Sequence, residues 1–298
     1  MQAASAKASA KPPANLLVKA PAKAPAKASP KPPINPSNIK TGLKRVLLVG
    51  INYIENEQNT LYGCINDVLN MDSKIRKAYP ECKEFRSLLD NQLDPLKKPT
   101  RKNILDSINW LTTGLMPGES VLFHYSGHGG LTVDYSGDEK GGYDSCIYPI
   151  QNGTIECITD DELRNYLVNK IPADCKCFAI LDCCHSGSAL DLRYIYNAPN
   201  YGTLTISQNE SYSKTKGSVI FLSGCKDTQT AADTVDKKNI PSGALTNALL
   251  QVWDKYGLSI KFKYLLWDVR VVLKEGGYDQ IPQLSCSNTI NLSDLFKL

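Results

Sequence analysis

The stretch KCFAILDCCHSGS, residues 176–188, determines how this sequence is organised. Its first half is an apolar run short enough to be a fully buried strand. Its second half is a cluster of nucleophilic and titratable groups that ends at Gly187. Catalytic groups of parallel α/β sheets collect at the carboxyl ends of the strands. The stretch therefore predicts a buried strand that carries reactive groups at its carboxyl end.

A second stretch, SVLFHYSGHGG at residues 120–130, has the same form of strand, polar groups and glycines. The chain has only three histidines, His124, His128 and His185, and all of them lie in these two stretches. A thiol needs an imidazole within hydrogen-bond reach to become a thiolate near neutral pH. Two neighbouring strand ends would supply both groups, with His128 as the base for Cys184.

Glycines close to these residues leave room for backbone N–H groups to approach an oxyanion. They are Gly127, Gly129, Gly130 and Gly187. His185 is adjacent to the thiol, but neighbouring strand residues point to opposite faces, so we expect it to be a supporting residue.

Two other interpretations compete with nucleophilic catalysis. A His-x-x-x-His pair chelates zinc on a helix, but a strand would separate His124 and His128 by about 13 Å, at roughly 3.3 Å per residue. The second alternative is that these cysteines and histidines are ordinary buried core residues. Two strand ends that each combine a reactive group with Ser-Gly favour catalysis over both.

The rest of the chain predicts a mainly parallel sheet with helices on both faces, because buried strands alternate with amphipathic helices. Further strands are predicted at 45–51, 85–89, 219–222 and 283–285, and helices at 63–79, 100–115, 160 onward, 243–255 and 259–274. Thr100 and Thr159 are the predicted N-caps. Asn152-Gly153 predicts a hairpin turn, and 191–217 is expected to be a loop.

Residues 1–44 are a low-complexity Ala/Lys/Pro/Ser segment, which predicts a disordered, partly polyproline II arm before a domain over 45–298. Residues 1–54 contain eight Lys, one Arg and no acid, which gives this segment a charge of +9. The whole chain has a net charge of +4, so the remaining residues carry −5. The arm lysines are not interleaved with aromatic residues, so we expect no specific nucleic-acid binding.

No stretch approaches the roughly 18 consecutive apolar residues of a membrane helix, so no membrane span is expected. Ten cysteines in a long chain without an apolar secretory segment favour reduced thiols. A cytoplasmic location is therefore expected, and an organelle-targeting arm is the alternative.

Five motifs in combination resemble the metacaspases, which are relatives of the caspases: YSGHG at 125–129, DCCHSG at 182–187, GCIND at 63–67, SGCKD at 223–227 and SGALT at 242–246. The resemblance covers 45–298 and is closest to the type I subgroup. It implies a caspase-like three-layer αβα sandwich with a mainly parallel central sheet. Its expected parts are a large-subunit-like region (45–200), a loop (201–217) and a small-subunit-like region (218–298).

The resemblance also implies roles for individual residues. His128 would be the base and Cys184 the nucleophile, whereas Cys183 lies where the family tolerates several small residues. Metacaspases cleave after Arg or Lys, and carboxylates suit a cationic side chain. The matching substrate-binding residues here are Cys64, Asp67, Ser126 and Asp182.

Many metacaspases need calcium, and the acids that match that site are Asp144, Asp160, Asp161 and Asp191. Hard oxygen ligands suit Ca²⁺. Asp160 and Asp161 are also ordinary acids for the first turn of a helix, and Ser145 stands where relatives commonly carry another acid.

The resemblance therefore implies a calcium-stimulated cysteine endopeptidase, active as a monomer on proteins or peptides with Arg or Lys at the cleaved position. Its own lysines make self-cleavage an expectation. The alternatives are a non-catalytic caspase-like scaffold and another cysteine acyl hydrolase of similar fold.

Overall fold

The computed structural model describes residues 42–137, 139, 141–225, 233–235 and 239–298. The predicted arm lies outside these residues except for its last three, 42–44. These three residues begin the first strand, β1 (Gly42–Gly50), instead of ending the arm.

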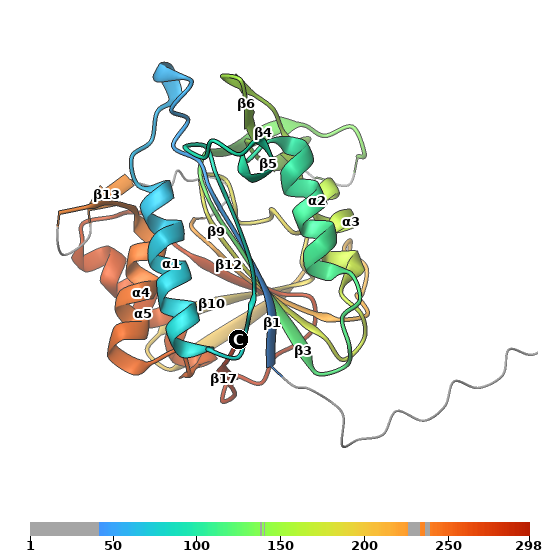
Figure 1. The fold of residues 1–298 in the computed structure, drawn as a ribbon. Helices are drawn as coiled ribbons and strands as arrows, with labels where there is room; N and C mark the ends of the chain where they lie inside the picture. Colours follow the sequence, from blue (N-terminus) through green and yellow to red (C-terminus); the bar gives the residue numbers. More distant parts are fainter. Residues whose placement is uncertain (1–41, 138, 140, 226–232, 236–238) are drawn as a thin grey trace, which may run out of the picture. The chain divides into compact units, whose positions relative to one another are not determined.

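An eight-stranded sheet forms the centre of the described domain, in the order β11-β10-β16-β12-β9-β3-β1-β2 (Figure 1). Strands β12, β9, β3, β1 and β2 run parallel, whereas β16, β10 and β11 extend the sheet with antiparallel pairs. The other strand bounds are β2 Glu84–Leu89, β3 Glu119–Ser126, β9 Lys176–Asp182, β10 Tyr194–Asn200, β11 Thr203–Gln208, β12 Ser218–Ser223 and β16 Gln283–Cys286. The predicted mainly parallel sheet is confirmed.

Helices cover both faces of this sheet, as Figure 1 shows. One face carries α1 (Cys64–Ala78), α4 (Ala244–Tyr256) and α5 (Phe262–Glu275), and the other carries α2 (Arg101–Thr112) and α3 (Asp160–Tyr166). Each face buries its own apolar cluster, and these clusters include Met71, Leu249 and Leu265 on the first and Ile104 and Leu163 on the second. The predicted three-layer αβα sandwich is confirmed.

Both predicted N-caps begin their helices. Thr100 Oγ1 accepts the N–H of Asn103 at 3.2 Å at the start of α2. Thr159 and Glu162 form a reciprocal capping box at the start of α3, with each side chain accepting the other residue's N–H at 3.3 Å. The N-terminal end of α3 is therefore placed by local sequence signals.

Smaller elements complete the described part of the domain. They are β4 Gly129–Val133, β5 Tyr143–Ile147, β6 Ile150–Gln151, β7 Thr154–Ile155, β8 Ile158–Thr159, β13 Asp233–Val235, β14 Pro241–Gly243, β15 Ile260–Lys261 and β17 Leu295–Phe296, with 3₁₀ turns at Glu57–Asn59, Pro95–Lys97 and Val168–Lys170. The predicted hairpin between β6 and β7 is confirmed. Its turn residues Asn152 and Gly153 have φ of +51° and +74°, as a type I′ turn requires.

The predicted loop over 191–217 is wrong for much of its length, and β11 also occupies part of 201–217, whose role as a junction between two subunit-like parts stays a prediction. Strands β10 and β11 occupy it as an antiparallel hairpin that extends the sheet. The residues of β11 are mostly exposed, so this edge strand lacks the continuous apolar run by which the buried strands were predicted. None of the helices in the described part of the chain is long and apolar enough to cross a membrane.

Candidate active site

The register between β3 and β9 brings the two polar stretches to one edge of the sheet. Their last paired residues are Ser126 and Asp182, and His128 and Cys184 each lie two residues beyond that pair. Neighbouring strands are only about 4.8 Å apart, so the segments that carry His128 and Cys184 leave the sheet next to each other. A Cβ added at Gly129 would collide with the carbonyl oxygen of Cys184. Glycine is therefore required for this close approach.

Two buried tyrosines hold the backbone of His128 from both sides. Tyr53 Oη accepts the N–H of His128 at 2.9 Å, and Tyr125 Oη donates to its carbonyl oxygen at 2.7 Å. His128 Nε2 lies 2.8 Å from the carbonyl oxygen of Asn59. Because a carbonyl oxygen only accepts, Nε2 carries the ring proton and Nδ1 remains as the basic nitrogen.

These three supporting residues were not predicted from the sequence. Tyr53 follows β1, so the rule that chemistry collects after parallel strands could have found it. Tyr125 lies inside a quoted motif, but its contact depends on how the chain turns after Ser126. Asn59 acts through its backbone carbonyl, for which the side-chain identity gives no signal.

Burial separates the two adjacent cysteines. Cys183 is 2% exposed, and this burial raises the pKa of its thiol well above the usual range. Cys184 is only partly buried. The chain turns sharply directly after the two cysteines. His185 has a φ of +49°, and Ser186 Oγ donates to the Cys183 carbonyl oxygen at 2.9 Å. Cys184 is therefore the thiol that a substrate can reach.

His124 is a core histidine. It is fully buried, its Nε2 lies 3.1 Å from Thr246 Oγ1, and burial lowers its pKa to about 3, so the ring is neutral. Among the residues that the structure describes, the only cluster of metal-binding side chains contains no histidine or cysteine. This geometry gives no support to a zinc pair at His124 and His128.

Asp67 and Asp182 face each other beneath the strand ends. A Cβ added at Gly243 would lie 2.7 Å from Asp67 Oδ2 and would collide with Asp182 Oδ2. Asp67 accepts the hydroxyl of Ser126 at 2.6 Å, and Asp182 accepts the N–H of Thr246 at 2.7 Å. Three of the four predicted substrate-binding residues therefore form one cluster.

Burial dominates the electrostatics of this acid pair. Burial first, and the charge of Asp182 second, raise the pKa of Asp67 to about 7. Hydrogen bonds from Ser242 Oγ at 2.5 Å and from the Gly243 N–H oppose this shift. Cys64, the fourth predicted residue, is buried one helical turn before Asp67 at the start of α1.

The structure brings two of the four predicted metal ligands together and adds one that was not predicted. Single oxygens of Asp160, Asp191 and Glu139 all lie within 4.8 Å of one another. The charge of Asp144 contributes to the pKa of Asp160, so Asp144 borders this acidic cluster. Asp161 is not a member, and its N–H donates to Asp160 Oδ1 at 2.9 Å.

The donor set of the acidic cluster fits a hard cation. Burial, followed by the charge of Asp191, raises the pKa of Asp160 to about 9. All the side-chain donors are carboxylate oxygens, which is the chemistry that Ca²⁺ prefers. Tyr212, which is distant in the sequence, donates its hydroxyl to the Glu139 carboxylate at 2.7 Å and holds it in place. Glu139 lies in a Gly- and Asp-rich segment without periodicity, so no spacing rule could have selected it.

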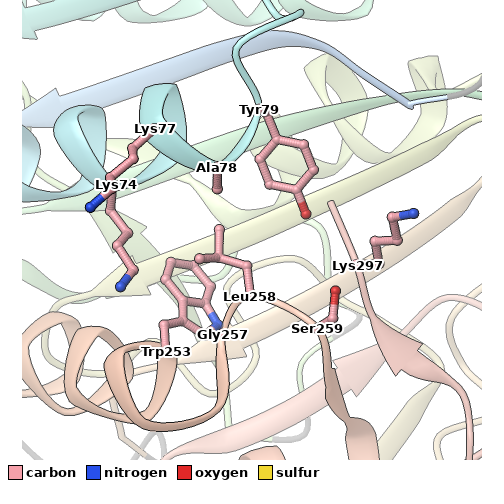
Figure 2. A pocket seen from close by; sticks show the side chains of 9 residues that line it. All are labelled: Lys74, Lys77, Ala78, Tyr79, Trp253, Gly257, Leu258, Ser259 and Lys297. Carbon is pink, nitrogen blue, oxygen red and sulfur yellow. The ribbon is translucent and has the colours of Figure 1, made fainter.

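A separate pocket of about 460 Å³ lies elsewhere in the domain (Figure 2). Its lining residues are Lys74, Lys77, Ala78, Tyr79, Trp253, Gly257, Leu258, Ser259 and Lys297. These residues include the last turns of α1 and α4, whereas the acid pair lies where those two helices begin. The pocket is therefore not part of the candidate site.

Comparisons with known proteins give the family. The family described as "Metacaspase, peptidase C14 domain" matches residues 44–193. Metacaspase-1 of Cryptococcus neoformans is 38% identical over 86% of this chain and 65% of its own length. Metacaspase-1 of Schizosaccharomyces pombe is 36% identical over 85% and 69%. Metacaspase-1B of Aspergillus clavatus is 36% identical over 88% and 75%.

This chain thus spans 65% to 75% of the length of these curated relatives. A crystal structure of a protein from Geobacter sulfurreducens resembles it with a TM-score of 0.60 over 86% of this chain and 99% of that one. The two sequences are 22% identical, so this likeness supports the fold alone. The family match and the curated relatives, together with the α/β sandwich, lead to one conclusion: the chain belongs to the metacaspase family.

Proposed function

We propose that this chain is a cysteine endopeptidase in which Cys184 is the nucleophile and His128 is the base. The observation that carries the proposal is the placement of both residues two positions beyond the last β3–β9 pair. With Nε2 bonded to Asn59, the Nδ1 atom of His128 accepts the thiol proton. The thiolate attacks the peptide carbonyl, His128 returns the proton to the leaving amine, and water then hydrolyses the thioester.

We further propose that the cleaved bond follows Arg or Lys. Asp67 and Asp182 are close enough for each charge to disfavour the other, which contributes to the raised pKa of Asp67. The guanidinium or ammonium group of a substrate Arg or Lys, bound next to these two carboxylates, would relieve their repulsion. An aspartate side chain would add a third negative charge, so substrates with Asp at this position should be rejected.

Calcium is proposed as an activator that takes no part in the chemical steps. Glu139, Asp160 and Asp191 would hold it, with Asp144 at the border of the cluster. Its charge would offset the repulsion among these carboxylates. Asp191 follows Cys184 by seven residues, so a cation held there would order the segment beside the nucleophile.

Self-cleavage after lysine is also proposed. Lys214 and Lys216 are exposed in the connection between β11 and β12, where a protease can reach the chain. The other candidates, Lys237, Lys238 and the arm lysines before residue 42, lie outside the described residues.

Peptide substrates ending in Arg, Lys or Asp, assayed with calcium and with chelator, test the proposal. Cleavage after Arg and Lys should require calcium and should be lost in Cys184→Ala. Replacing Asp67 by Ala should reduce the preference for cations. Absence of all turnover would favour the scaffold, and turnover of esters but not peptides would favour another acyl hydrolase.

Mass spectrometry of the intact chain tests self-cleavage separately. Wild type in calcium should lose mass at one or more lysines, whereas Cys184→Ala and the chelator-treated wild type should remain intact. Equal masses in all of these samples would contradict self-processing.

A further inference from the structure

Two cysteines that no proposed step uses, Cys146 and Cys157, lie in contact beside the candidate site. Both are free thiols, and their side chains are hydrogen-bonded to each other. Cys146 of β5 is paired with Thr159 of β8, so Cys157 lies two residues from its cross-strand partner. Cys157 directly precedes β8, and residues two apart in extended chain share a face, so the two side chains lie on the same face of the strand pair.

The two thiols differ in exposure. Cys146 is 2% exposed, whereas Cys157 is only partly buried. The backbone at Cys157 is held in place, because Arg101 Nε donates to its carbonyl oxygen at 3.1 Å and the guanidinium pairs with Glu162. A small oxidant can therefore reach Cys157 while Cys146 stays shielded beside it.

We propose that Cys146 and Cys157 form a reversible disulfide when the chain meets a peroxide. One of the two sulfurs attacks a peroxide oxygen, the O–O bond breaks, and water is released as that cysteine becomes a sulfenic acid. The other sulfur then attacks the sulfenic acid sulfur, the S–O bond breaks, and a second water is released as the S–S bond forms. One peroxide is reduced to two waters, and two thiols are oxidised to one disulfide.

This bond would brace the acidic cluster, an inference that rests on the proposed calcium site. Asp144 lies two residues before Cys146, and Asp160 lies three residues after Cys157. The disulfide would close the segment 146–157 and hold together the two strands that lead to these acids. Ligands held in place before binding lose less conformational freedom when the ion arrives. Oxidation should therefore strengthen calcium binding.

The test uses the full chain carrying Cys184→Ala, so that neither oxidation of the nucleophile nor self-cleavage interferes. Treatment with equimolar hydrogen peroxide should lower the mass by about 2 Da, the two thiol hydrogens, and dithiothreitol should reverse the change. Non-reducing peptide mapping should join Cys146 to Cys157. The midpoint of thermal unfolding should rise by on the order of 5 °C, because the bond restricts the unfolded chain.

Two matched variants in the Cys184→Ala background separate the pair from other thiols. Cys157→Ser should lose both the linked peptide and the rise in midpoint. Cys82→Ser should retain both, because Cys82 lies outside the pair with its thiol donating to the Lys44 carbonyl, a role that a hydroxyl can fill. A linked peptide that joins other cysteines, or none at all, would overturn the disulfide.

Calcium titration of the oxidised and reduced protein by calorimetry tests the brace. The oxidised chain should bind calcium with a severalfold lower Kd. An unchanged Kd in a chain with the linked peptide would overturn the brace. Peptide mapping and thermal unfolding depend on neither catalysis nor calcium, so failure of the disulfide is distinguishable from failure of the proposed function.

Discussion

Replacing Asp160 by Asn should stabilise the calcium-free chain near neutral pH. Burial, followed by the charge of Asp191, raises the pKa of Asp160 from 3.8 to about 9. A carboxyl whose folded pKa is raised contributes stability below its unfolded pKa, and that stability is lost as the pH rises through the folded pKa. Asn carries no charge, and its single side-chain oxygen can accept only one of the two N–H groups that Asp160 accepts on separate oxygens, Ser145 N–H on Oδ2 and Asp161 N–H on Oδ1.

The size of the effect follows from the same two pKa values. Near pH 7 the carboxyl is ionised in the unfolded chain and protonated in the folded one. Taking up this proton lowers the free energy of unfolding by about 1.4 kcal/mol for each pH unit above 3.8, which is about 4 kcal/mol in total. Asp160 is 2% exposed, so solvent screening reduces this value little. Leaving one buried N–H without its acceptor costs about 1–3 kcal/mol, so we expect a net gain of about 1–3 kcal/mol. The unfolding midpoint should then rise by about 3–8 °C.

Thermal unfolding of the Cys184→Ala chain between about pH 5 and pH 9, in chelator and in calcium, measures this effect. The parent should lose stability with rising pH more steeply than the Asp160→Asn variant, and calcium should stabilise only the parent. Asp161→Asn is the matched control, because it makes the same chemical change outside the cluster. If Asp160→Asn is less stable than the parent at every pH, or gains as much from calcium, the reasoning is refuted.

Three further predictions concern the candidate catalytic site. Cys184→Ala should abolish peptide cleavage, whereas Cys183→Ala should keep this activity and lose about 1 kcal/mol of stability. Fluorogenic peptide assays and thermal unfolding measure the two effects. An inactive Cys183→Ala beside an active Cys184→Ala would show that the assignment is reversed. The KM for an Arg substrate should fall as the pH rises through about 7, because Asp67 loses its proton there, and a flat KM would contradict a role for this acid. Tyr125→Phe should lower kcat about tenfold with little change in KM, since it releases the carbonyl of His128, and an equal change in both constants would point to substrate binding instead.

The amino-acid sequence was sufficient to predict the sheet and the place of its chemistry. The apolar runs before His128 and Cys184 are too short and too continuous for anything but buried strands, and β3 and β9 are fully or almost fully buried. Parallel strands end at one edge, so the polar groups that follow them had to meet there. The caps Thr100 and Thr159 were equally local, because an N-cap bonds a backbone N–H only a few residues ahead.

Only the tertiary structure decided which distant groups complete the site. Asn59 reaches His128 through a backbone carbonyl, which every residue type possesses. Glu139 joins Asp160 and Asp191 because a segment without periodicity folds back over the start of α3. The exposed strand β11 buries too little apolar surface to produce the apolar pattern by which a strand is predicted from sequence. These contacts depend on chain geometry between remote segments, and no pattern of neighbouring side chains encodes that geometry.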